Sequence, residues 1–303
     1  MGPRTTEDEA LLARAEAWAG SDNDVPDTAA LNEIARREGL EFATAVWYSR
    51  VIRAPANAAF LRSAGAAMES RPPAPDLIGI VPGAFHREHR GTGADGARIV
   101  RVARSLGCAA EVIPLPGFGR LADNARIIRE WLAARRGRRV TLVSLSKGGA
   151  DMRAALSTPD AAEVFAGVCA WVSLSGIVRG TALVEWLRAR PLRWLAVRAH
   201  LWWRGHPRGA LDELARRSEA SIAPWPALPP GLRVVHVYGV PVERHLAHPW
   251  AGKAHRRLSG LGPNDGGGVL LGDVGHLPGI VCPVWGGPLS RRPGGSDRFW
   301  AEF

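Results

Sequence analysis

The chain has 303 residues and a mass of 32.5 kDa, which is enough for one large domain or two small ones. Hydrophobic residues make up 46% of the sequence and charged residues 22%, which excludes an intrinsically disordered chain. The formal net charge is +10. Because the basic residues are scattered and no aromatic–basic recognition module is present, we expect no nucleic-acid partner.

Cysteine usage and apolar segments limit the class further. Cys108, Cys169 and Cys282 lie far apart without a CxxC pair, which fits neither a disulfide framework nor a zinc site. The acidic N-terminus has no apolar signal region, and no stretch of about 18 uncharged apolar residues is present. The sequence also lacks a Gly-rich phosphate loop, a metal cluster and a cofactor motif. We therefore expect a cytoplasmic protein without a metal or cofactor.

The first 70 residues are predicted to form an N-terminal helical extension. Thr6 and Glu9 make a capping-box pattern before apolar residues at helical spacing. The Ala-rich segment 42–68 also predicts a helix. The segment 71–75, with the sequence RPPAP, interrupts the helical pattern and marks the end of the extension.

Beyond residue 75, short apolar runs alternate with helical patterns. The predicted strands are residues 77–81, 112–115, 140–145, 168–174, 232–240 and 280–285. Strands that alternate with helices of this length are typical of an α/β fold, with a mostly parallel sheet and helices on both faces. We expect residues 1–303 to form a single domain of this class.

Residues 180–231 interrupt the alternation and predict a helical lid insertion. Within them, residues 182–204 mix Leu and Trp with five arginines, so a helix here has one apolar and one cationic face, broken at Pro191. One interpretation is a cover over an acyl pocket, or a segment in weak contact with a membrane surface. The other is a helix packed on the domain with solvated arginines.

The third strand leads into the most informative motif, Ser144-Leu145-Ser146-Lys147-Gly148, which is followed directly by a helical pattern. A serine hydroxyl is a weak nucleophile, so catalysis requires it to be presented on a tight turn within reach of a base. The small residues Ser144 and Gly148 let strand and helix pass closely. Ser146 is the candidate nucleophile, and the Lys147 N–H is a candidate oxyanion donor. The alternative is an ordinary strand–helix turn with a capping serine.

The loop after the first strand is expected to supply the second oxyanion donor. Gly83 allows the backbone to approach closely, and Ala84 or Phe85 would offer the N–H group. The alternative is a Pro-Gly turn without a ligand. His86 and His89 follow in the same loop, and we expect them to be surface or gate residues rather than bases.

With these motifs, the chain resembles a serine esterase or lipase of the α/β-hydrolase family. The resemblance runs from about residue 77 to residue 285 and is carried by residues 81–89, 143–149 and 261–266. It implies hydrolysis of a carboxylic ester through an acyl-enzyme, with a small-molecule or lipid substrate. It also implies that Asp265, in the Asn-Asp-Gly segment, is the acid that orients the catalytic base. The same segment is an ideal β-turn, and Glu243 is the second candidate acid.

In that family the catalytic histidine follows the last strand, at its carboxyl end. Here the run 280–285 is followed by Gly-Gly-Pro-Leu-Ser-Arg and no histidine. His276 is the nearest candidate, and it closes the triad if residues 269–274 are the true last strand. The other histidines are expected to be structural or on the surface: His200, His206, His236, His245, His248 and His255.

The missing histidine has two further explanations, a natural loss or a frameshift near Gly287. Residues 287–291 can be encoded by a string that reads Asp-His-Tyr-Leu-Ala when it is shifted by one base. The Arg-, Gly- and Pro-rich tail is typical of an out-of-frame segment in a GC-rich gene. This hypothesis predicts a disrupted C-terminus that removes the base.

Three functions are compatible with these features. The first is a serine hydrolase, and the second is a non-catalytic protein of the same fold that binds an apolar ligand. The third is a basic nucleic-acid or membrane-surface binder. Loss of one triad member lowers turnover by roughly 10⁴–10⁶, so a chain without the base would fold but turn over little substrate.

Overall fold

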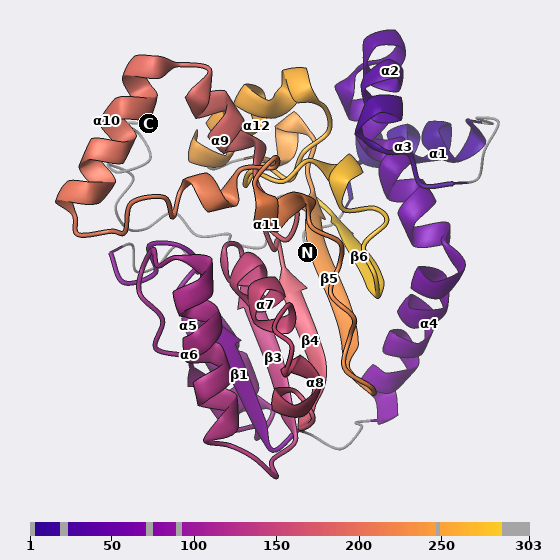
Figure 1. Ribbon diagram of the computed structural model, residues 1–303. Coiled ribbons are helices and arrows are strands. Elements are labelled where there is room, and N and C mark those ends of the chain that lie inside the picture. The colour runs from indigo at the N-terminus through magenta and orange to yellow at the C-terminus, as the bar shows by residue number, and fades with distance from the viewer. Residues whose placement is uncertain (1–3, 19–23, 71–74, 89–92, 247–248, 287–303) are drawn as a thin grey trace. The chain divides into compact units, whose positions relative to one another are not determined.

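The computed structural model describes residues 4–18, 24–70, 75–88, 93–246 and 249–286 (Figure 1). The chain divides into two compact units. The first unit consists of Met1–Pro72 and His236–Arg291, and the second unit of Pro73–Val235 and Arg292–Phe303. The predictions for His89, His248 and the segment 287–291 fall outside the described residues.

The strands are hydrogen-bonded in the order β2-β1-β3-β4-β5-β6. Their bounds are β1 (Leu77–Val81), β2 (Ala110–Val112), β3 (Val140–Leu145), β4 (Val168–Leu174), β5 (Arg233–Val240) and β6 (Ile280–Trp285). The first three residues of β5 belong to the second unit and the rest to the first. β1 pairs in parallel with β2 and β3, and β3 pairs in parallel with β4. The predicted α/β class with a mostly parallel sheet is confirmed.

Helices cover both faces of the sheet in the second unit. Gly79 and Ile80 are neighbours in β1, so they face opposite sides of the sheet. Trp131 of α6 (Leu121–Ala133) packs against Gly79, where a Cβ would lie 2.7 Å from its ring. Gly96, which caps α5 (Ala97–Ser105), packs against the side chain of Ile80 on the other face.

Of the remaining helices of the second unit, two follow β3 and the others lie within residues 180–231, the segment predicted to be an insertion. Their bounds are α7 (Gly148–Leu156), α8 (Ala161–Val164), α9 (Ala182–Arg188), α10 (Pro191–Trp203), the 3₁₀ turn η1 (Asp212–Leu214) and α11 (Glu219–Ile222). In Figure 1, α7 and α8 lie in front of the strands. The predicted break at Pro191 is confirmed, because Pro191 occupies the first turn of α10, where its missing N–H costs nothing.

The first unit combines the N-terminal helices with the last strands. Its elements are α1 (Thr6–Ala17), α2 (Thr28–Glu38), α3 (Leu40–Arg53), α4 (Pro55–Ser70), most of β5, η2 (Glu243–His245), α12 (Pro249–Leu258), η3 (Ser259–Leu261), η4 (Leu271–Asp273) and β6. None of the described helices is both long and apolar enough to cross a bilayer.

Two details of the N-terminal helices correct the sequence-based expectations. The capping box of α1 is formed by Thr5 and Asp8 rather than by Thr6 and Glu9, so the helix begins one residue earlier in register. The predicted helix over 42–68 is two helices, because Pro55 has no N–H to continue α3 and instead begins α4.

Two strand predictions are also corrected. β2 ends at Val112, not at Leu115, because Pro114 has no N–H and the Leu115 N–H turns back to the Ile113 oxygen, 2.8 Å away. Residues 269–274 do not form a strand. They contain the 3₁₀ turn η4 and a single bridge between Asn264 and Leu270, so β6 is the last strand of the described chain.

Candidate active site

Ser146 lies on a strained turn between β3 and α7. Its φ of 48° is in the left-handed region, which non-glycine residues adopt rarely. The turn is held from both sides: the Ser146 N–H donates to Leu174 O at 3.0 Å, and Ser146 O accepts from Ile177 N at 2.9 Å. The side chain is partly exposed. A hydroxyl on a sharp strand–helix turn is the arrangement that a serine nucleophile requires.

Gly148 lets the helix that follows Ser146 pass close to β1. A Cβ at this position would lie 2.6 Å from the Val81 oxygen and 2.8 Å from the Pro82 oxygen, so no larger residue fits without a backbone shift. Ser144 takes the place of a glycine on the strand side. It is fully buried, and its hydroxyl accepts a hydrogen bond from Trp171 Nε1 at 2.9 Å. The motif therefore tolerates a serine there because the hydroxyl has a partner.

Two backbone N–H groups near Ser146 are available as oxyanion donors. Lys147 lies at the start of α7, and Ala84 lies in the loop after β1; neither N–H donates a hydrogen bond to any described residue. The same loop lies against the turn at Ser146, because a Cβ at Gly83 would lie 3.5 Å from the Ser146 Cβ. Phe85 does not serve, since its N–H donates to Gly117 O at 2.7 Å. Of the two candidates left open, Ala84 therefore has the N–H without a described acceptor.

The Lys147 side chain points into the protein. Its Nζ pairs with Asp151 Oδ1 at 2.6 Å, and both side chains are almost completely buried. Burial raises the pKa of Asp151, and the lysine opposes that effect. This pair was not singled out from the sequence, although the i, i+4 spacing on a helix is a signal for it.

Arg153, also in α7, joins this helix by hydrogen bonds to the segment 178–223. It is buried and donates to Val178 O at 2.8 Å, Ser221 O at 3.1 Å and Ala223 O at 2.5 Å. Burial lowers its pKa to about 10. The sequence carried no signal for this role, because carbonyl acceptors depend only on the tertiary fold.

His86 is buried, so of the two expectations, a surface residue or a gate residue, the first is wrong and the second is not tested. Its Nδ1 lies 3.0 Å from Gly83 O, so the ring is held against the loop that follows β1. Burial lowers the pKa of His86 and so favours its neutral form. No hydrogen bond of the Ser146 hydroxyl is found among the described residues, to His86 or to any other group.

Asp265 is buried in the loop between η3 and η4. Its Oδ1 accepts from Gly267 N at 2.8 Å and from Val269 N at 2.9 Å. Burial raises its pKa to about 6, despite these hydrogen bonds, which lower it. A carboxylate fixed in this way is suited to orient a base, as the resemblance implies. Glu243, the second candidate, is largely exposed and pairs with Arg256.

The carboxyl ends of β5 and β6 meet at the loop that carries Asp265. The Gly286 N–H, directly after β6, donates to Val240 O at the end of β5, 3.1 Å away. On the other side, a Cβ at Gly266 would contact Pro241, the residue after β5, at 3.9 Å. The described part of β6 therefore ends on the side of the sheet where Asp265 lies.

His276 lies at the opposite end of β5. Pro278, two residues after it, accepts from His236 near the start of that strand, with Nε2 and O 3.3 Å apart. His236 and Pro241 are five residues apart, or roughly 16 Å along a strand. His276 is itself exposed, and its Nε2 contacts Val25 O at 2.6 Å. The structure thus does not bring His276 to Asp265.

His245 is the described histidine at the carboxyl end of β5, and both of its ring nitrogens are engaged. Nε2 contacts Asp8 Oδ1 at 3.0 Å, and Nδ1 accepts from Val242 N at 3.3 Å. Asp8 also accepts from Arg244 Nη2 at 2.5 Å. These contacts give His245 a structural role.

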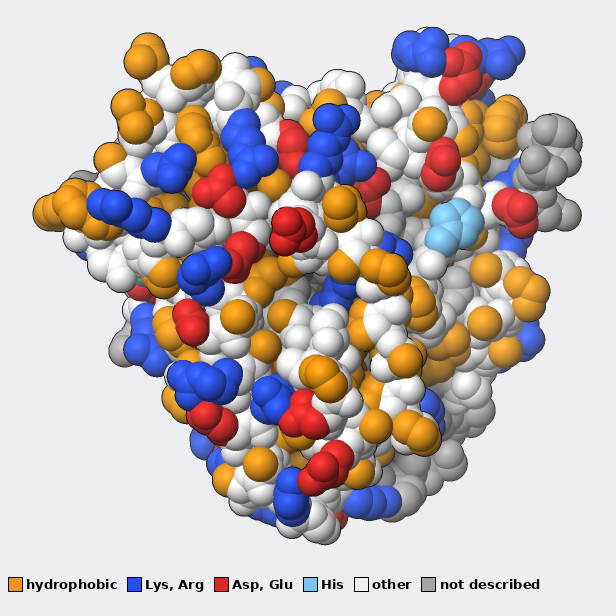
Figure 2. Space-filling view, in the orientation of Figure 1, with side chains coloured by type: hydrophobic (Ala, Val, Ile, Leu, Met, Phe, Trp, Pro, Cys, Tyr) orange, Lys and Arg blue, Asp and Glu red, His pale blue; other side chains and the backbone are white. Residues whose placement is uncertain are grey.

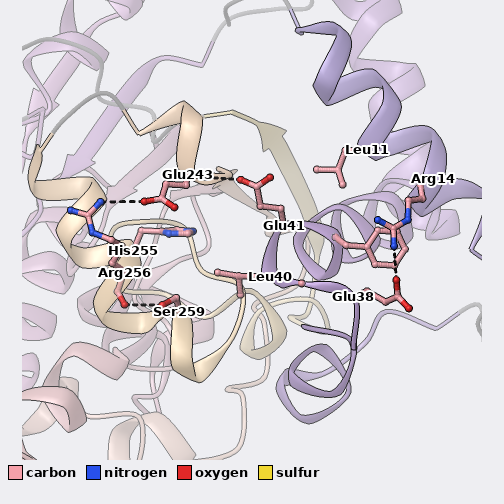
Figure 3. A pocket seen from close by; sticks show the side chains of 11 residues that line it. Leu11, Arg14, Glu38, Leu40, Glu41, Glu243, His255, Arg256 and Ser259 are labelled. Atoms are coloured by element: carbon pink, nitrogen blue, oxygen red, sulfur yellow. Dashed lines mark hydrogen bonds and ion pairs between the residues drawn. The ribbon is translucent and has the colours of Figure 1, made fainter. Parts of the chain in front are cut away.

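A cavity of about 410 Å³ lies within the first unit (Figure 3). Its polar lining includes Glu41, Glu243 and the ring of His255, which points into it. None of its lining residues belongs to the turn at Ser146 or to the loop that follows β1. In the described part of the chain, no group of three or more His, Cys, Asp or Glu side chains is arranged to hold a metal ion.

The comparison with known proteins gives the fold its name. No protein-family model and no curated protein matches the sequence. Among solved structures, the metagenomic carboxyl esterase MGS0156 has a TM-score of 0.54 and 20% identity, covering 76% of this chain and 70% of that chain. For the mature Bacillus licheniformis lipase BlEst2, the TM-score is 0.50 and the identity 20%, with coverage of 71% and 86%. The chain has an α/β-hydrolase fold. Within this fold, the turn at Ser146 follows the third strand and precedes a helix, as the resemblance predicted.

Proposed function

We propose that this protein hydrolyses carboxylic esters, of a small molecule or a lipid, with Ser146 as the nucleophile. The observation that carries the proposal is the left-handed turn at Ser146, which presents its hydroxyl beside two N–H groups without other described partners. In the first step, the Ser146 oxygen attacks the ester carbonyl and loses its proton to a base. The Lys147 and Ala84 N–H groups then stabilise the oxyanion, and the alcohol leaves to give an acyl-enzyme that water hydrolyses.

Asp265 is proposed as the acid that orients the base, because it is buried and fixed by backbone N–H groups. We propose residue 288 as the base position, because the shifted reading frame encodes a histidine there and β6 ends on the side where Asp265 lies. The sequence has proline at this position. A natural loss or the frameshift near Gly287 accounts for it, and turnover of the chain as written is expected to be low.

The insertion is proposed to cover the site and to make weak contact with a membrane surface. Its buried side chains Val184, Val197 and Leu201 share one apolar cluster with Phe85 of the oxyanion loop and with Phe118. Since this cluster includes the partly buried Ala84, the insertion shields the proposed oxyanion donor from water. Exclusion of water strengthens the electrostatic stabilisation of a developing oxyanion.

A fluorophosphonate probe tests the nucleophile, because it forms a covalent bond only with an activated serine. We expect slow labelling of the wild-type chain and none of Ser146→Ala. Ser63→Ala, an exposed helical serine, is the matched control and should label like wild type. Labelling that is equal in wild type and Ser146→Ala would refute the proposal.

The double substitution Gly287→Asp with Pro288→His tests the base position. It restores an Asp-His pair after β6 and should increase the labelling rate at Ser146 by at least tenfold, out of the roughly 10⁴–10⁶ that a complete triad contributes. His276→Asn should leave the rate unchanged. If His276→Asn abolishes labelling instead, the base is His276 and our placement is wrong.

A further inference from the structure

The helix α10 has one face that is fixed inside the second unit. Val197 and Leu201 are buried in the apolar cluster with Phe85, Phe118 and Leu121, and Trp194 packs against it. These residues share one side of the helix at 100° per residue. The inner face of α10 is therefore buried against the core of the second unit and is not available to a partner.

The outer face of α10 is apolar and exposed. The exposed fractions are 86% for Leu192, 67% for Leu195, 59% for Trp202 and 75% for Trp203. At 100° per residue, these four side chains form a stripe on the side opposite Val197 and Leu201. Single exposed apolar residues are normal on a soluble protein, but a stripe of large ones on a single helix marks an interaction surface.

The surroundings of this stripe are strongly cationic. Residues 186–211 contain six arginines and no acidic residue. Arg193 and Arg198 flank the stripe on its two sides, and Arg208 lies over the ring of Trp202 at 5.3 Å. Arg188 pairs with Asp212; for the other five, no carboxylate partner is found among the described residues. In Figure 2, hydrophobic and basic side chains gather together over the region of α10, at the upper left.

We propose that the outer face of α10 docks the protein on an anionic phospholipid surface. The residue types of the stripe and its flanks favour a lipid surface as the partner. Tryptophan prefers the membrane interface, leucine inserts at the edge of the acyl chains, and arginine reaches the phosphate groups. The stripe is a single convex helix face without a groove, which suits a flat lipid surface. The proposal deepens the membrane contact suggested for the insertion and rests on this exposed face, not on catalysis. The inner face of α10 stays packed on the oxyanion loop in the docked state.

Co-sedimentation with vesicles tests the docking in a Ser146→Ala background, where hydrolysis cannot interfere. We expect binding to phosphatidylcholine vesicles that contain phosphatidylserine, weak binding to phosphatidylcholine alone, and loss of binding at high salt. Trp203→Glu should reduce the partition coefficient by roughly tenfold or more. Arg198→Gln should reduce it by roughly fivefold on anionic vesicles, because an arginine near the surface contributes about 1 kcal/mol.

Leu106→Glu is the matched control, since Leu106 is 68% exposed in another part of the same unit. It should bind like the parent chain. Thermal unfolding followed by circular dichroism shows that each variant is folded. Two results would overturn the proposal: equal loss of binding in Leu106→Glu and Trp203→Glu, or no binding to anionic vesicles at low salt. In the second case, sedimentation velocity that detects a dimer dissociated by Trp203→Glu would assign the stripe to a second copy of the chain. The labelling experiment at Ser146 is independent of both results.

Discussion

The buried carboxyl group of Asp265 lowers the free energy of unfolding when it is ionised. Its pKa is about 6 in the folded chain and near 3.9 when unfolded, so folding favours its protonated form. A raised acid pKa contributes stability below pH 4, and this contribution is lost as pH rises through 6. At pH 8 the ionised group therefore lowers the stability, by on the order of 3 kcal/mol. A buried carboxylate that destabilises the fold at neutral pH is typical of a functional group.

We expect Asp265→Asn to raise the free energy of unfolding at pH 8 by about 1–3 kcal/mol and to leave it unchanged at pH 4. The amide oxygen still accepts from Gly267 and Val269, but the side chain no longer ionises. Denaturant unfolding at the two pH values measures the difference. Glu163→Gln, on the surface, should change neither value. A variant less stable than wild type at pH 8 would show that the carboxylate serves the fold.

Individual site residues differ in how far the sequence predicts them. The turn at Ser146 is local, because a β-branched strand, small flanking residues and a helix all lie within a dozen positions. The choice between Ala84 and Phe85 depends on Gly117, which is distant in sequence and accepts the Phe85 N–H. His276 was a candidate only while the last strand was uncertain.

At the scale of elements, the path of α7 across β1 is decided by Gly148. The two carbonyl oxygens of Val81 and Pro82 lie where a side chain would begin, and they belong to the strand and loop that precede Ala84, the proposed oxyanion donor. A displacement of α7 would therefore move Ser146, Lys147 and the loop at the same time. The small residue is required by packing and by the site together.

Gly148→Ala should destabilise the protein by about 1–3 kcal/mol and slow fluorophosphonate labelling, because the added Cβ overlaps backbone oxygens. Gly252→Ala in α12 is the matched control. Its nearest neighbour is the flexible Arg256 guanidinium at 3.4 Å, so alanine should stabilise the helix by up to about 1 kcal/mol. Thermal unfolding and the labelling rate are measured for both. Similar melting temperatures for the two variants would contradict this explanation.

The ends of helices and strands could be predicted where residue types in the sequence change at the boundary. β1, β3, β4 and β6 begin and end as predicted, because each is a largely apolar run bounded by charged, Pro, Gly or Ser residues. The division of α3 from α4 was missed although Pro55 marks it, since Ala-rich flanks read as one helix. The end of β2 depends on a backbone turn at Pro114.

At the scale of the whole molecule, the +10 charge makes stability sensitive to acid. Protonation of carboxylates adds to the positive charge and removes ion pairs. In the first unit, Asp8 holds Arg244 and His245, and its pKa lies well below the usual range. Burial raises the pKa, but hydrogen bonds from the Thr5 backbone and from the Arg244 and His245 side chains outweigh that effect.

A lowered acid pKa contributes stability above pH 4, and this contribution is lost as pH falls. Asp8→Asn should therefore destabilise the protein at pH 7 by about 2 kcal/mol, because Arg244 and His245 lose a charged acceptor. Its stability should also fall less steeply than wild type below pH 4. Glu7→Gln, the exposed neighbour, should have little effect. Urea unfolding from pH 3 to pH 7 tests both; equal pH profiles for Asp8→Asn and wild type would exclude the assignment.

The buried pair in α7 has a practical consequence for chemical conjugation. The chain contains 37 arginines but only two lysines, Lys147 and Lys253. Lys147 is sealed behind Asp151, whereas Lys253 on α12 is open to solvent. An amine-directed dye or linker will therefore couple to one side chain in the native protein, apart from the terminal amine. The protein can therefore be immobilised or labelled through Lys253 without modification of the turn at Ser146.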